Sequence, residues 1–129
     1  MRAMAEEVVG AEWLAERSRE ARQRAEEAQQ AAERARKRVV ELHQRRRIGP
    51  IGPAEALERR LLAEERLAQV EASLEEARRR SVNAHERTAR VDDRSGRRAD
   101  AQRHYEAADA GRQLIENEAM KAQRRQPKA

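Results

Sequence analysis

The chain contains no cysteine and no phenylalanine, and one tryptophan and one tyrosine are its only aromatic residues. The absence of cysteine excludes disulfide bonds, thiol catalysis and thiolate metal ligands. Glycine and proline are scarce, with five and three residues in a chain of 129. No apolar run approaches the roughly 18 residues that a membrane-spanning helix needs, and no signal-peptide pattern is present. We therefore expect a cytoplasmic protein that does not associate with a membrane.

What the chain does contain is charge and alanine. Charged residues make up 41% of the sequence and the formal net charge is +5. A prevalence of Ala, Glu and Arg is typical of long helices and coiled coils. Because alanine buries little apolar surface, at roughly 25 cal/mol per Å², we expect a thin core that is stabilised by long helix–helix contacts. Lysine occurs only at positions 37, 121 and 128, and a GC-rich genome explains this arginine excess without invoking nucleic-acid binding.

A heptad pattern runs through the first third of the chain. Small and apolar residues alternate at steps of three and four, with Glu7 as the one charged exception, which is typical of a coiled-coil seam. The pattern predicts one helix over residues 3–47, about 65 Å long at 1.5 Å per residue. The residues of the seam are Met4, Ala11, Leu14, Ser18, Ala21, Ala25, Ala28, Ala32, Ala35, Val39 and Leu42.

The stretch "RRRIGPIGP", Arg45 to Pro53, contains the main cluster of glycine and proline. Gly49 suits the residue after a helix, and Pro53 suits the first turn of the next one. We therefore expect a turn at residues 48–53, a second helix over residues 54–92, and an antiparallel pairing centred on Ile51. In this register Arg36, Lys37 and Arg38 lie level with Glu64 and Glu65, and Leu67, Val70 and Leu74 lie opposite alanines.

The heptad phase breaks at "VDDRSGRRAD", residues 91–100, which indicates a bend at residues 93–97 and a third helix over residues 98–124. The alternative is an uninterrupted second helix, since one glycine costs only about 1 kcal/mol in a helix. With the bend, Trp13 and Tyr105 lie at one level and fill a three-helix section, and residues 125–129 form a disordered tail. The predicted fold is all-α. It is a long antiparallel helical hairpin, a coiled coil, with a third C-terminal helix folded back on its open end, in a single domain of residues 1–124.

Under this arrangement the third helix is too short to cover the half of the hairpin nearest the turn. A second apolar set lies there outside the seam, and uncovered leucines at helical spacing usually contact another chain. We therefore expect a homodimer, and a helical protein partner is also compatible with this surface. The candidate partner-binding residues are Ile48, Ile51, Leu57, Leu61 and Leu62.

The residues that could carry catalysis or bind a metal show no organised pattern. His85 and Glu86 begin "HERTA", but the zinc-binding helix motif needs a second histidine where this chain has Ala89. His104 falls about a turn away from His85 in our register. No nucleophile–base arrangement, phosphate-binding loop or cofactor fingerprint is present. We expect no enzyme activity, no cofactor and no metal site.

Arginine clusters are the best argument for nucleic acid, because phosphate binding needs several cations on one surface. The clusters at residues 34–38, 78–80 and 124–125 have glutamates nearby and are interpreted as solvated helix faces. Arg45, Arg46 and Arg47, at the expected tip of the hairpin, are the candidate polyanion-binding residues. No aromatic platform for stacking bases accompanies them.

Two short resemblances suggest an origin. "YEAAD", Tyr105 to Asp109, resembles the Y-x-x-x-D/E export signal of type VII secretion substrates, which are helical hairpins, although the turn lacks their Trp-x-Gly. Residues 81–113, with Ala84-His85-Glu86-Arg87 and His104-Tyr105-Glu106, resemble Ala/Arg/Glu-rich short helical proteins of high-GC actinobacteria. That resemblance implies a lineage and no activity.

These observations favour a non-catalytic, self-associating scaffold or adaptor. The alternative is an accessory protein that binds DNA or RNA, and a type VII-secreted hairpin is a minor alternative.

Overall fold

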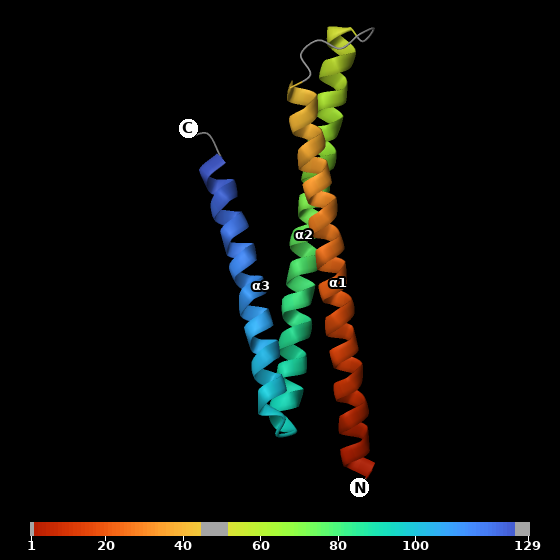
Figure 1. Ribbon diagram of the computed structural model, residues 1–129, viewed down its shortest axis with the longest axis vertical. Coiled ribbons are helices and arrows are strands. Elements are labelled where there is room, and N and C mark those ends of the chain that lie inside the picture. Colours follow the sequence, from red (N-terminus) through yellow and green to blue (C-terminus); the bar gives the residue numbers. More distant parts are fainter. Residues whose placement is uncertain (1, 45–51, 126–129) are drawn as a thin grey trace. The chain divides into compact units, whose positions relative to one another are not determined.

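The computed structural model describes residues 2–44 and 52–125, without the side chains of residues 2–9 and of Ala11. The protein is all-α and consists of α1 (Arg2–Gln44), α2 (Pro53–Arg94) and α3 (Arg98–Arg125), with no strand in the described ranges (Figure 1). None of these helices combines the length and the apolar character that crossing a membrane requires. Most of the expected turn at residues 48–53, and the expected tail after Arg125, lie outside the description.

The helix ends that are described follow from local chemistry. The carbonyl of Gly52 accepts a hydrogen bond from the amide of Ala56 at 3.0 Å, so Gly52 caps α2 and Pro53 occupies its first position. Proline fits there because its missing N–H would have no helical partner.

At the other end of α2, Gly96 has a φ of 79°. Its amide bonds to the carbonyl of Asp93, and the amide of Arg97 bonds to the carbonyl of Asp92. This pair of bonds is the Schellman motif, in which a left-handed glycine ends a helix. The carbonyl of Arg97 then accepts the first bond of α3, from Ala101. The alternative of one uninterrupted second helix is therefore wrong.

The chain divides into two compact units. The first combines Met1–Ala25 with Glu76–Ala129, and we call it the three-helix unit because α1, α2 and α3 all contribute to it. The second is Glu26–Glu75, which we call the two-helix unit because its helical residues belong to α1 and α2.

In the two-helix unit, α1 and α2 run in opposite directions. Arg36 forms an ion pair with Glu71 at 3.6 Å, and seven residues later His43 contacts Glu64 at 2.8 Å. Ala32, Leu42 and Leu74 are buried. The expected register, with Arg36, Lys37 and Arg38 level with Glu64 and Glu65, is wrong, because the observed pairs are centred just after Pro53 and not on Ile51.

The buried residues of the three-helix unit are unusual because half of those described are polar. Val82, Ala89, Ala101 and Ala108 are accompanied by Ser18, His85, Thr88 and Asp92. Gly111 of α3 packs so closely on α2 that a Cβ added there would lie 2.6 Å from Cγ2 of Val82. Trp13 does not fill the section as expected. It is 56% exposed and its ring lies under the guanidinium of Arg17.

Candidate interaction surfaces and the buried polar cluster

A hydroxyl pair joins α1 to α2 inside the three-helix unit. The Oγ of Ser18 lies 2.7 Å from Oγ1 of Thr88, and both residues are almost completely buried. Each hydroxyl also lies within hydrogen-bonding distance of the Ala84 carbonyl, and Thr88 also reaches the carbonyl of Leu14. Ser18 holds a position of the heptad seam in the sequence, which small side chains can occupy. The two hydroxyl groups convert this part of the seam into a specific polar contact, because buried polar groups need partners.

Two histidines join α2 to α3. Nδ1 of His85 lies 2.9 Å from Nδ1 of His104, and the expectation that they are a turn apart is wrong. One nitrogen donates to the other, so the contact accommodates a proton on only one of the two Nδ1 atoms. Burial lowers the pKa of His85 below its ordinary value of 6.5, and the nearby His104 and Arg22 lower it further.

An acidic residue completes the cluster at the end of α2. The carboxylate of Asp92 accepts a hydrogen bond from Nε of Arg97 at 3.0 Å and lies 4.0 Å from Nε2 of His104. Nearby, Arg112 of α3 forms an ion pair with Glu86 of α2. Within the described residues no group of three or more His, Asp or Glu side chains is arranged to hold a metal ion. The Ser18–Thr88 contact joins α1 to α2, and the His85–His104 contact joins α2 to α3.

The lowered pKa of His85 predicts a pH-dependent stability. When pH falls through about 6.5, the unfolded chain takes up a proton on His85 before the folded chain does, so the free energy of unfolding falls. Urea unfolding of the wild type between about pH 7.5 and pH 5.5 should show this loss. The variant His85→Gln should show a smaller dependence on pH over the same interval. An equal slope in both proteins would contradict the assignment of the effect to His85.

A surface of exposed leucines lies on α2 in the two-helix unit. Leu57, Leu61 and Leu62 are 50%, 56% and 58% exposed. They do not form one stripe, because Leu62 lines a groove between α1 and α2 that neither Leu57 nor Leu61 lines. We call Leu57 and Leu61 the leucine face. Ile48 and Ile51, and the arginines at positions 45–47, lie outside the described residues.

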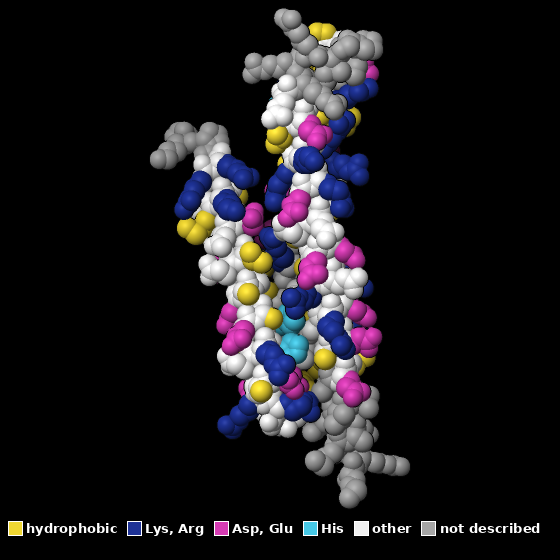
Figure 2. Space-filling model, in the orientation of Figure 1, with side chains coloured by type: hydrophobic (Ala, Val, Ile, Leu, Met, Phe, Trp, Pro, Cys, Tyr) yellow, Lys and Arg dark blue, Asp and Glu magenta, His cyan; other side chains and the backbone are white. Residues whose placement is uncertain are grey.

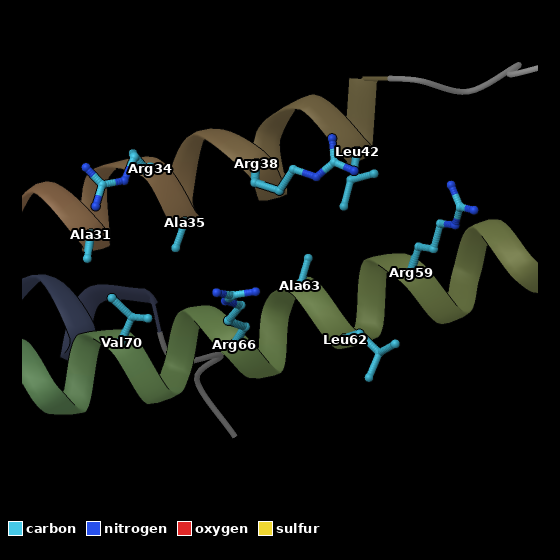
Figure 3. Close-up of a pocket in the computed structure, with 10 residues that line it drawn as sticks. All are labelled: Ala31, Arg34, Ala35, Arg38, Leu42, Arg59, Leu62, Ala63, Arg66 and Val70. Carbon is cyan, nitrogen blue, oxygen red and sulfur yellow. The ribbon is translucent and has the colours of Figure 1, made fainter.

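The groove has a volume of about 560 Å³. Figure 3 shows Ala31 and Ala35 of α1 pointing toward Val70 and Ala63 of α2 across it. Its apolar lining is completed by Leu42 and Leu62, and its polar lining consists of Arg34, Arg38, Arg59 and Arg66. The space-filling view in Figure 2 shows Lys and Arg side chains interspersed with acidic ones on the face it presents. The groove differs from such mixed surfaces because none of the described residues that line it is acidic.

Sequence reasoning missed the four groove arginines as a set. Arg34 and Arg38 are one helical turn apart, and Arg59 and Arg66 are one heptad apart, so each pair lies on one side of its helix. That spacing is enough to predict that one side of each helix carries a pair of arginines. It could not have shown that the two pairs face the same groove, because this depends on the rotation of each helix about its axis.

Comparison with protein-family models, with curated proteins and with solved structures finds no match to this chain. The resemblance to actinobacterial helical proteins stays a prediction. In the stretch that resembles an export signal, Tyr105 is half-buried and Asp109 accepts a hydrogen bond from Arg112 at 2.7 Å.

Proposed function

We propose that this protein is a non-catalytic helical interaction module, a scaffold or adaptor that self-associates in the cytoplasm. In this proposal α1 and α2 form an antiparallel coiled-coil hairpin, and α3 folds back along its open end. The opposite directions of α1 and α2 in the two-helix unit support the hairpin. The observation that carries the function is the leucine face, because two leucines one turn apart and at least half exposed favour contact with another helix.

The leucine face predicts a dimer that charge substitution disrupts. We expect sedimentation equilibrium at tens of micromolar to give twice the chain mass for the wild type and the chain mass for Leu57→Glu/Leu61→Glu. In the dimer the two new carboxylates would be buried at the interface, and the free-energy cost of removing their charges from water would oppose dimerisation. The matched control is Leu114→Glu/Met120→Glu, which changes two exposed apolar residues that lie on α3 and not on the leucine face of α2. A monomeric wild type, or equal dissociation of both variants, would contradict the proposal.

Binding of DNA or RNA through Arg45, Arg46 and Arg47 is the alternative. It predicts retardation of nucleic acid that falls steeply with salt and is abolished by changing all three arginines to glutamate. Retention of the dimer without salt-dependent retardation favours the scaffold.

A further inference from the structure

The contact between α1 and α2 in the two-helix unit has two unlike edges. One edge is closed by the ion pair Arg36–Glu71 and by the contact of His43 with Glu64, in both of which α1 contributes the nitrogen group and α2 contributes the carboxylate. The other edge is the groove, whose described lining includes arginines from both helices and no carboxylate from either. Each helix therefore presents cations toward the other across an apolar floor.

The groove arginines are only partly neutralised within the protein. Arg59 pairs with Glu55 at 3.5 Å and Arg38 with Glu41 at 4.0 Å, in both cases a partner on the same helix. Arg34 and Arg66 have no ion pair or hydrogen bond to any described residue. Two guanidinium groups, one on each helix, are thus available to an anionic ligand beside a surface of alanine, leucine and valine.

We propose that this groove binds an amphipathic α-helix of a partner protein, with an apolar stripe flanked by glutamate or aspartate. The inference rests on the proposed function as an interaction module and names its partner class. Ala31, Ala35 and Ala63 leave room for a third helix to approach closely, and larger apolar residues of that helix fill the groove. Carboxylates on its two flanks reach Arg34 on one side and Arg66 on the other, where guanidinium groups bind them in bidentate geometry.

The apolar floor favours a helix over nucleic acid. A sugar–phosphate backbone would satisfy the arginines but would leave the alanine, leucine and valine side chains without an apolar partner. The lining residues that the structure describes include no aromatic side chain on which a base could stack. An acidic amphipathic helix satisfies both the charge and the apolar surface, and it is the occupant to which the groove is complementary.

The test is fluorescence anisotropy of the full chain with a labelled synthetic helix of about three heptads, with leucine along one face and glutamate at its flanks. Its control is a peptide of the same composition whose order gives no apolar face. Duplex DNA and single-stranded RNA are measured alongside. We expect saturable binding of the first peptide, weakened about tenfold or more by Arg34→Glu/Arg66→Glu. The exposed pair Arg19→Glu/Arg87→Glu, in the three-helix unit, makes the same change in net charge and should bind as the wild type does.

Equal binding of both peptides, equal loss in both variants, or tight binding of nucleic acid in place of the helix would overturn the proposal. Far-UV circular dichroism of both variants verifies that the helices are retained. Sedimentation of the same samples separates this inference from the proposed function. If the dimer forms but no peptide binds, only the groove assignment fails. If peptide binds to a monomeric wild type, self-association through the leucine face fails and the groove stands.

Discussion

Replacing Asp92 with alanine should destabilise the protein by about 3 kcal/mol, the cost expected when one partner of a buried ion pair is removed. The Asp92 side chain is 8% exposed and its carboxylate bonds to Nε of Arg97. Nη2 of Arg97 is already buried without a hydrogen-bond partner. Loss of the carboxylate would leave more of this guanidinium unpaired, beside a histidine cluster that supplies no compensating anion.

The expected cost lies toward the lower end of the range for buried pairs because Arg97 is partly exposed. Its side chain is 32% exposed, so water can solvate one side of the guanidinium after the carboxylate is lost. The variant Asp92→Asn keeps an oxygen that can accept from Nε and removes the charge. We therefore expect it to fall between the wild type and Asp92→Ala.

Urea unfolding followed by circular dichroism measures this effect, and the chain offers a close control. Asp93 is the next residue of the same helical turn and is exposed. Replacing it with alanine removes a negative charge near the negative end of the α2 dipole, so Asp93→Ala should be neutral or slightly stabilising. Equal free energies of unfolding for Asp92→Ala and Asp93→Ala would show that the Asp92–Arg97 contact contributes little.

The helix breaks could be predicted from sequence because their signals are local. Gly96 can adopt the left-handed conformation that ends α2, and Pro53 begins a helix readily. The third helix was expected from residue 98, where α3 begins. Heptad spacing likewise identified the seam of the first helix, which contains Ser18, Ala32 and Leu42, all of which are buried.

The side-chain contacts could not be predicted, since they depend on the rotation and axial register of each helix. A shift of a few residues in the pairing centre is enough to place Glu71 beside Arg36 in place of Glu64 or Glu65. For the same reason the sequence did not predict that His85 contacts His104, or that four arginines line one groove. The size and hydrophobicity of Trp13 predict a core position. The side chain instead lies at the surface, where the guanidinium of Arg17 covers one face of the ring and much of the rest contacts solvent.

Replacing Ala89 with leucine should destabilise the three-helix unit by about 3 kcal/mol, at the upper end of the usual cost of overpacking. Ala89 is 0% exposed on α2. It lies one heptad after Val82, on the face where Gly111 of α3 approaches too closely to admit even a Cβ. Because the helices are already in contact there, a leucine side chain fits only if α3 moves away from α2. That movement would also separate His85 from His104 and Arg112 from Glu86.

The control is Ala110→Leu, at an exposed position of α3. Leucine and alanine have similar helix propensities, so this substitution changes the intrinsic stability of a helix by only a few tenths of a kcal/mol, roughly. The difference in the free energy of unfolding between Ala89→Leu and Ala110→Leu, measured in urea, therefore reports the packing of α3 on α2. If Ala89→Leu had the same free energy of unfolding as the wild type, α3 would be able to move away from α2 without loss of stability. In that case small side chains would not be the reason that α3 packs closely on α2, and the polar contacts around His85 and Asp92 would have to hold it.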